Sequence, residues 1–339
     1  MSIPALATTS VGSFPRPGWL AETSRNQAAF RMSGDALAEA LDDATVVVLR
    51  EQEELGLDLL TDGEIRRTHF VFHIAGRWAG IDTENLAVKS IYRNRAADRL
   101  VPRITGKIVR AAPAAVAAVA DLQAARRRTA RPLKMAVPGP MTVADSAVNA
   151  FYRDEAEVAM DAATAINGEL RDLQAAGCAV LQIDEPAMTR YHDKVRAYGA
   201  EALDRCLDGI SVPTVVHLCY GYPGGGARQH HYRYDDLLPQ LMRTRIGGFT
   251  VEFGRSAFDP QVLKMCGNRI VMFGCIDPGD TPPPSVEAVE RRVGEALEYL
   301  DPRQVWLAPD CGLMTINRDL ARRKLAVMVE AAARLRASL

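Results

Sequence analysis

Residues 179–187 read AVLQIDEPA, an apolar run of strand length that ends in two carboxylates. Strands that are buried on both faces of a parallel sheet show such continuous apolar runs rather than strict alternation. Seven other runs have the same character, and we expect all eight to be strands. The eight runs are Ala7–Phe14, Leu57–Ile65, Leu133–Gly139, Ala179–Ala187, Thr214–Tyr220, Gly248–Gly254, Arg269–Asp277 and Val305–Cys311.

Helical patterns separate these runs. Apolar residues recur along one stripe of Gly34–Leu55, and Gly56 follows where a helix favours glycine. We expect further helices at Glu155–Ala176, Ser285–Leu300 and Asn317–Leu339. Repeated strand–helix alternation predicts a parallel sheet, and eight units predict an α/β fold, the (β/α)8 TIM barrel, formed as one unit by residues 1–339. An open doubly wound sheet is the alternative, but no G-x-G-x-x-G motif follows the first strand.

The segment from Thr68 to Arg131 is too long for a single crossover. We interpret it as a helical or hairpin excursion between the second and third strands, at the barrel mouth, with a helix near Ala111–Ala125. The arginine run at 126–128 is interpreted as a solvated helix end. GYPGGG at 221–226 is expected to form a flexible loop after the fifth strand.

The composition excludes several classes of protein. Of 339 residues, 48% are hydrophobic, which is enough for a buried core and argues against disorder. The 41 basic and 42 acidic residues give a net charge of -1, which argues against a nucleic-acid partner. We expect a cytoplasmic protein without a membrane partner, because neither a long apolar run nor a signal-peptide pattern is present. The six cysteines are widely spread and indicate free thiols or metal ligands rather than disulfides.

The clearest chemical signal is a possible metal site at the strand ends. His217 and Cys219 are two residues apart at the end of the fifth strand, so their side chains share one face. Taken alone, this pair also fits an inward histidine with a satisfied hydrogen bond beside a buried cysteine. Glu252 and Cys311 end the sixth and eighth strands, and the carboxyl ends of barrel strands meet around one active site. Together the four side chains form a set of one nitrogen, two sulfurs and one oxygen, which suits Zn²⁺.

Several further motifs accompany these residues in order along the chain. They are TTSVGSFP at 8–15, DGE at 62–64, PGPMT at 138–142, QIDEPA at 182–187, HLC at 217–219, VE at 251–252 and PDCGL at 309–313. With them, the chain resembles the catalytic domain of cobalamin-independent methionine synthase. The resemblance implies a zinc-containing (β/α)8 barrel that transfers a methyl group to the thiol of homocysteine.

The resemblance also implies a role for individual residues. His217, Cys219, Glu252 and Cys311 match the zinc ligands of the family. Ser13, Glu64 and Asp184 match the residues that hold the amino-acid head group of homocysteine.

Each head-group role has a physical basis. Glu64 and Asp184 are expected to pair with the substrate ammonium, and the Ser13 hydroxyl or nearby amides with its carboxylate. The alternative for Asp184 is a hydrogen-bonded strand end. The mechanism we expect is zinc-activated alkyl transfer to a thiol, with Glu64 and Asp184 as catalytic-site residues. Asp277 is the candidate acid for the leaving group, with Asp280 or His230 and His231 as alternatives, although a solvated loop is favoured for the two histidines. Arg66 and Arg67 are interpreted either as surface ion pairs or as contacts to an anionic group.

Two departures from the family concern the methyl donor. The full-length enzymes of the family carry an additional N-terminal barrel that helps to hold folate, and we expect no such barrel in this chain. They also carry a histidine-containing loop after the seventh strand, where this chain has GCIDPGDTPPP at 274–284. Methyl-tetrahydrofolate and a methylcorrinoid, delivered by a partner corrinoid protein, are therefore both considered. The alternative functions are zinc-dependent addition of a thiol such as coenzyme M to an epoxide, and zinc storage. Glu64 and Asp184 weigh against a sulfonate thiol, because a sulfonate favours cations.

Overall fold

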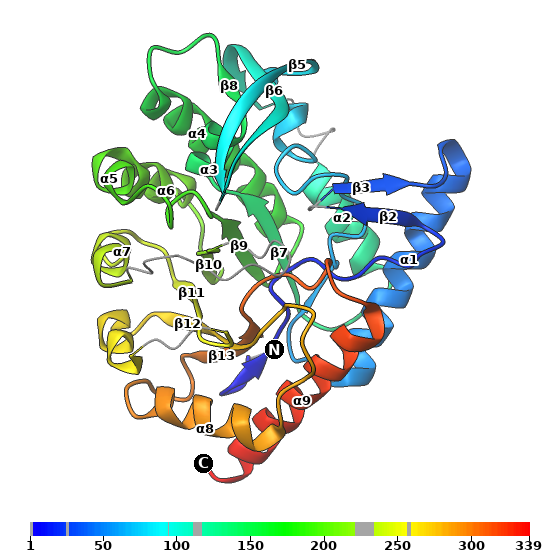
Figure 1. Cartoon of the computed structure of the whole chain (residues 1–339), viewed down its shortest axis with the longest axis vertical. Helices are drawn as coiled ribbons and strands as arrows, with labels where there is room; N and C mark the ends of the chain where they lie inside the picture. The colour runs from blue at the N-terminus through cyan, green and yellow to red at the C-terminus, as the bar shows by residue number, and fades with distance from the viewer. Residues whose placement is uncertain (1–2, 25–26, 94, 111–116, 221–233, 256–258) are drawn as a thin grey trace.

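Eight parallel strands form the central sheet of the computed structural model, which describes residues 3–24, 27–93, 95–110, 117–220, 234–255 and 259–339 (Figure 1). The spatial order is β1-β13-β12-β11-β10-β9-β7-β4. The strands are β1 (Ala7–Thr8), β4 (Leu60–Thr61), β7 (Leu133–Pro138), β9 (Val180–Asp184), β10 (Thr214–His217), β11 (Gly248–Glu252), β12 (Ile270–Ile276) and β13 (Val305–Pro309). Each lies within one of the eight predicted runs, so the strand prediction is confirmed.

The sheet closes on itself between its first and last strands. The Thr8 carbonyl accepts the N–H groups of Asp58 at 3.0 Å and of Leu59 at 3.1 Å, and Thr9 forms a parallel bridge with Leu59. These bonds join β1 to the start of β4. Closure confirms the (β/α)8 barrel and excludes the open doubly wound sheet.

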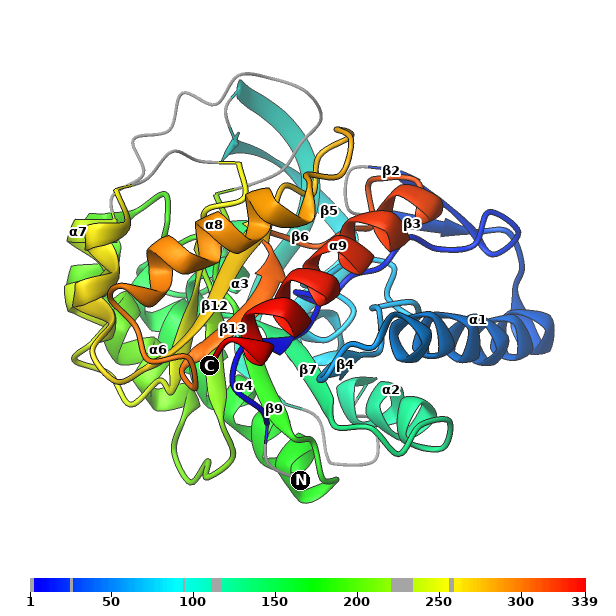
Figure 2. The ribbon, with the colours of Figure 1, turned by 90° about the horizontal axis from the view of Figure 1, so that it is seen from below.

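Helices surround the barrel (Figures 1 and 2). The longer ones are α1 (Gly34–Leu55), α2 (Ala117–Arg126), α4 (Glu155–Ala175), α7 (Tyr234–Leu241), α8 (Val286–Leu297) and α9 (Arg318–Ala337). Shorter helices and turns are η1 (Ala75–Arg77), α3 (Pro140–Ser146), α5 (His192–Lys194), η3 (Val195–Gly199), α6 (Ala200–Cys206) and η4 (Pro260–Cys266). No helix of the described residues has the length and apolar character needed to cross a membrane.

The helix boundaries follow capping chemistry. The predicted bounds of α1 are confirmed, and Gly56 ends it in the left-handed conformation at φ 82°. Helices α8 and α9 begin one residue later than predicted, because Ser285 and Asn317 are their N-caps and accept backbone N–H bonds. Their predicted ends extended two or three residues too far, and α4 ends one residue early.

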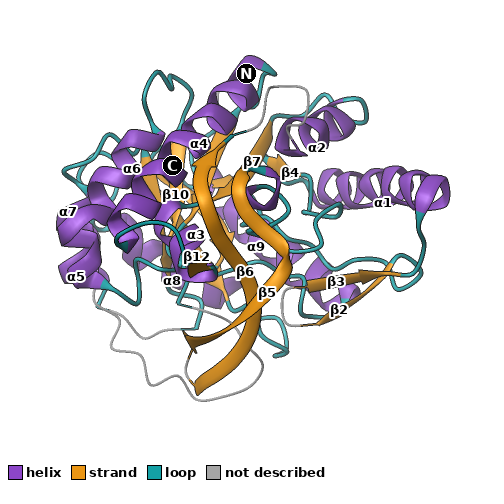
Figure 3. Cartoon of the chain, turned by 90° about the horizontal axis from the view of Figure 1, so that it is seen from above, coloured by secondary structure: helices purple, strands orange, loops and turns teal. Residues whose placement is uncertain are grey.

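The predicted excursion is a long antiparallel hairpin, β5 (Ala79–Arg93) and β6 (Arg95–Val109), followed by α2 (Figure 3). A short strand, β8 (Val148–Asn149), pairs with β6. The hairpin is fixed to α3, because Lys89 donates to the carbonyls of Ala144 at 3.2 Å and Ala147 at 2.7 Å. A hairpin excursion is therefore confirmed.

Two smaller features of the fold are the arginine run at 126–128 and a short hairpin near the N-terminus. Helix α2 ends at Arg126, so the arginine run is a helix end as predicted, and Arg128 pairs with Asp42 at 3.7 Å. The small hairpin of β2 (Ala21–Ser24) and β3 (Gln27–Phe30) was not predicted from the sequence. The loop predicted at 221–226, like His230 and His231, lies outside the described residues.

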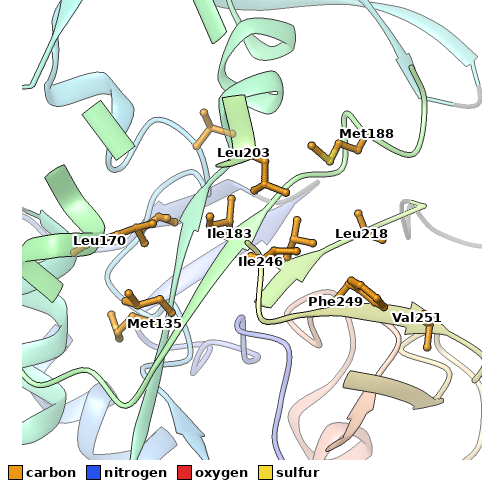
Figure 4. Close-up of a cluster of buried hydrophobic side chains, with 14 of the residues drawn as sticks. Met135, Leu170, Ile183, Met188, Leu203, Leu218, Ile246, Phe249 and Val251 are labelled. Atoms are coloured by element: carbon orange, nitrogen blue, oxygen red, sulfur yellow. The ribbon is translucent and has the colours of Figure 1, made fainter. Parts of the chain in front are cut away.

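The barrel strands bury side chains on both faces of the sheet, one toward the surrounding helices and one toward the barrel interior. Met135, Ile183, Phe249 and Val251 belong to the large core cluster that the strands share with Leu170 and other helix residues (Figure 4). A separate small cluster contains the alternate positions, among them Val180, Val215, Met272 and Trp306, and fills the lower barrel interior. Further along the same inward faces come Gln182, Asp184, His217, Thr250 and Glu252, all buried. Apart from Lys134 on β7, the interior side chains named here are thus apolar toward the amino ends of the strands and polar toward their carboxyl ends.

Candidate metal centre and head-group pocket

His217, Cys219 and Cys311 form a compact group at the carboxyl ends of the strands. One ligand atom from each lies within 4.8 Å of the others, which makes them a candidate metal site. The two sulfurs are 3.3 Å apart, and the Cys311 sulfur is 3.7 Å from His217 Nε2. Cys219 and Cys311 are separated by 92 residues, and barrel closure is what brings them together.

Thr250 orients the imidazole of His217. Its hydroxyl lies 3.0 Å from His217 Nδ1 and accepts the N–H of Leu218 at 2.9 Å. The Nε2 atom is therefore left facing the two sulfurs. Histidines that bind metals usually have their second nitrogen held in this way. Sequence analysis missed Thr250, although its place two residues before Glu252 on the same face of a strand was a usable signal.

Glu252 lies at the end of β11 and is fully buried. Its Oε1 accepts the N–H of Tyr220 at 3.0 Å, and its own N–H donates to the Tyr234 hydroxyl at 2.8 Å. Among the described residues, the group of converging ligand atoms comprises His217, Cys219 and Cys311. The role of Glu252 as a fourth metal ligand stays a prediction. Its carboxylate accepts the N–H of Tyr220, the residue that follows Cys219.

The electrostatics of the group favour a bound cation. Contact with the Cys219 sulfur, together with burial, raises the pKa of the Cys311 thiol well above its usual range. Burial lowers the pKa of His217, but the hydrogen bond and charge of Cys219 outweigh it, and the net shift is upward. Two adjacent sulfurs resist carrying two negative charges unless a cation lies between them. One imidazole nitrogen and two sulfurs are donors that zinc accepts well, so the residues present fit this metal.

Ser13, in the loop after β1, packs directly against the segment that carries Cys311. The Ser13 carbonyl accepts the N–H of Leu313 at 2.9 Å. A Cβ atom added at Gly312 would lie 2.0 Å from Ser13 Oγ, so a larger residue there would displace the Ser13 hydroxyl. The predicted head-group residue and the predicted metal ligand are thus neighbours in space.

Glu64 has an unusual backbone conformation with φ 53°, a strained region for a residue with a side chain. A buried arginine, Arg16, stabilises it by donating to the carbonyls of Glu64 and Arg67 at 2.7 Å each and of Ile65 at 3.2 Å. A Cβ atom at Gly12 would lie 2.5 Å from Glu64 Oε1. The turn is therefore built to hold this carboxylate against the first loop.

The two arginines after Glu64 have different surroundings. Arg66 forms an ion pair with Asp42 near the surface, which confirms one of the two interpretations for this residue. Arg67 is only 1% exposed, so the surface interpretation is wrong for it. Its guanidinium lies 3.8 Å from Glu64 Oε1 and donates to the Ala136 carbonyl at 2.8 Å. The anionic group beside Arg67 is thus a side chain of the protein itself.

Asp184 is the register partner of His217 on the adjacent strand. Gln182 Nε2 donates to Asp184 Oδ1 at 2.7 Å. Burial and the neighbouring Asp184 charge raise the pKa of Glu64, against the opposing effect of Arg67. These two carboxylates repel each other, and a ligand cation near both would relieve the repulsion.

Asp277 follows the last residue of β12 and is half-buried. Its Oδ1 accepts the N–H of Gly279 at 2.8 Å, and its carbonyl accepts from Lys324 Nζ at 2.6 Å. It lies on the same rim as the metal group, since β12 and β11 are adjacent. Its role as an acid stays a prediction.

Together, these features define a (β/α)8 barrel with a set of side chains that could hold a metal ion, and with buried carboxylates, at its carboxyl end. The chain belongs to the family described as the cobalamin-independent synthase catalytic domain, whose model matches residues 6–334. It is 32% identical to a methionine synthase of Sulfurisphaera tokodaii over 97% of this chain and 92% of that protein. A methionine synthase of Saccharolobus solfataricus is 31% identical over 97% and 94%.

Solved structures agree with this assignment. A B12-independent methionine synthase from Shewanella, in complex with selenomethionine, superposes with a TM-score of 0.93 at 30% identity, covering 99% of both chains. A putative vitamin-B12 independent methionine synthase from Listeria monocytogenes, at 20% identity and a TM-score of 0.74, shares the fold. Because this family is defined as cobalamin-independent, the prediction that a partner corrinoid protein delivers the methyl group is not supported.

Proposed function

We propose that this protein is a zinc-dependent methyltransferase that methylates the thiol of homocysteine to give methionine, with residues 1–339 forming one catalytic barrel. The observation that carries the proposal is the pairing of His217 with Asp184 in register across β10 and β9. This pairing brings an imidazole that can bind a metal, and through it a thiol, next to a carboxylate on the adjacent strand that can bind an ammonium. The names of the relatives support the same reaction.

His217, Cys219 and Cys311 would hold zinc, with Glu252 as the fourth and most replaceable ligand. Bound zinc supplies Lewis acidity, which lowers the pKa of a bound thiol and keeps its sulfur nucleophilic at neutral pH. Thr250 holds the imidazole ring in the orientation that presents Nε2. The Tyr220 N–H holds the Glu252 carboxylate beside the site, at 3.0 Å.

Glu64 and Asp184 bind the ammonium of homocysteine, and Ser13 binds its carboxylate. Both acidic side chains are nearly buried, with 7% and 8% exposure, so their attraction for a cation is weakly screened. Holding the head group orients the thiol for attack, which contributes to the rate by positioning. Asp277 is the candidate acid for the leaving group. Selenomethionine, named for the Shewanella structure, is an amino acid of the product's shape and supports an amino-acid head-group pocket.

The test is a methyl-transfer assay with zinc-loaded protein, L-homocysteine and methyl-tetrahydrofolate, which becomes the first donor to examine. Formation of methionine, absent after metal removal and restored by zinc, is the expected result. A parallel assay with 2-mercaptoethanesulfonate and an epoxide addresses the alternative function. Turnover of that pair in the absence of homocysteine methylation would overturn the proposal.

A further inference from the structure

A lysine is buried inside the barrel directly below the head-group pocket. Lys134, on β7, is 1% exposed. Its ammonium donates to the Val11 carbonyl at 2.6 Å and to the side-chain carbonyl Oε1 of Gln182. Burial lowers the pKa of Lys134 to about 8, although the charges of Asp184 and Glu64 oppose this shift. The proposed reaction leaves this buried cation without a role.

The ammonium determines which way the Gln182 amide faces. A lysine ammonium has donors only, so the Gln182 atom that contacts it must be the carbonyl oxygen. The amide nitrogen then faces Asp184 and donates to Oδ1 at 2.7 Å. Within the part of the chain that the structure describes, no hydrogen bond reaches Asp184 Oδ2. One carboxylate oxygen is therefore fixed, and the other is free for a ligand.

The same lysine also connects the two sides of the pocket. Val11 lies two residues before Ser13 in the first loop. Lys134 thus links the backbone of that loop to the Asp184 side of the pocket through Gln182. Val180, the register partner of Lys134 on β9, and Val215 on β10 are apolar side chains of the barrel interior. A buried lysine and glutamine are costly where apolar residues can fill the space, and this favours a role for them in the pocket above.

We propose that Lys134 and Gln182 are positioning residues, which orient Asp184 so that its free oxygen meets the ammonium of the amino-acid substrate. This inference rests on the proposed function and adds a determinant of selectivity for amino-acid thiols over thiols that lack the amine. Because the contribution acts through Asp184, losing it should affect only substrates that carry an ammonium.

The experiment compares wild type, Gln182→Met and Lys134→Met with two thiols, L-homocysteine and 4-mercaptobutyrate, which is homocysteine without its amino group. Binding to the zinc-loaded protein is measured by calorimetry, and KM and kcat are measured where turnover occurs. In both variants, we expect the affinity for homocysteine to fall by about tenfold, as for the loss of a charge-assisted hydrogen bond, with kcat nearly unchanged. The affinity for 4-mercaptobutyrate should stay the same.

Gln304→Met is the matched control. Gln304 donates to the carbonyls of Gly267 at 3.0 Å and Arg269 at 2.9 Å, at the opposite end of the barrel from the pocket. This variant should bind both thiols as the wild type does. A variant that loses affinity for both thiols alike, or a Gln182→Met protein that keeps the wild-type preference for the amine, would overturn the inference. If wild-type protein binds homocysteine no better than 4-mercaptobutyrate, the proposed function itself fails.

Discussion

His217 and Asp184 face each other as register partners on adjacent parallel strands. Neighbouring strands lie about 4.8 Å apart, so a molecule of amino-acid size can contact both side chains at once. His217 belongs to the candidate metal group and Asp184 to the proposed head-group pocket. In the proposed function, this spacing links the chemistry of a thiol to the recognition of an amine.

Replacing either metal-binding cysteine should remove the metal. We expect Cys219→Ala and Cys311→Ala to lose both bound zinc and turnover, because each supplies one of the three ligand atoms that converge among the described residues. Zinc per chain is measured by elemental analysis after dialysis. Cys266→Ala, which alters a buried cysteine in η4, is the control and should keep its metal. Full zinc content in the Cys219 or Cys311 variant would contradict the assignment.

Thr250 should influence metal affinity without contacting the metal. Thr250→Val removes the hydroxyl that fixes His217 Nδ1, and we expect zinc affinity to fall by about 10- to 100-fold. Thr250→Ser keeps a hydroxyl at that position and should restore most of the affinity. Competition with a chromogenic chelator measures both. Equal affinities for the valine and serine variants would show that the hydroxyl has no such role.

Asp184→Asn should weaken homocysteine binding far more than it weakens folding. The substitution keeps the shape of the side chain but removes the charge that is proposed to pair with the ammonium. A charge-assisted hydrogen bond contributes about 1.5–3 kcal/mol, so KM for homocysteine should rise by about 10- to 100-fold. Steady-state kinetics and thermal unfolding are measured on the same samples. An unchanged KM would place the amine elsewhere.

Arg16 should be important for the conformation of Glu64. We expect Arg16→Met to destabilise the fold by about 3 kcal/mol, since three buried backbone carbonyls each lose a hydrogen bond from the guanidinium. Arg303→Met, which removes a guanidinium that is 84% exposed and paired with Asp301, should change stability by less than about 1 kcal/mol. Urea unfolding of the two variants tests the difference. Similar losses in both would argue against the role of Arg16.

Lys134→Met should change how stability depends on pH. Below pH 8 the ammonium is charged in both the folded and the unfolded chain, and its burial destabilises the wild type. As pH rises from about 8 toward 10.5, the folded chain loses this proton first and the destabilisation disappears. Relative to the variant, the wild type should therefore gain up to about 3 kcal/mol between pH 7 and pH 10.5. Urea unfolding of both proteins across this range gives the difference, and parallel pH curves would contradict the prediction.

The sequence by itself determined the architecture and the chemical types at the site. Apolar runs of strand length and the helical stripes between them are local patterns, so the eight strands and the barrel could be predicted. His217 and Cys219 could be paired because residues two apart in a strand share a face. Cys311 could be added because carboxyl ends of barrel strands converge wherever they lie in the sequence.

Only the tertiary structure revealed the contacts that orient these groups. Thr250 beside His217, Arg16 beneath Glu64, and Lys134 with Gln182 below Asp184 join residues from different strands and loops. Spacing along a strand can place Thr250 and Gln182 on the inward face, but the partner of each side chain depends on strand register and barrel closure. Local patterns determine which face a side chain takes. Register and closure determine which side chain it meets.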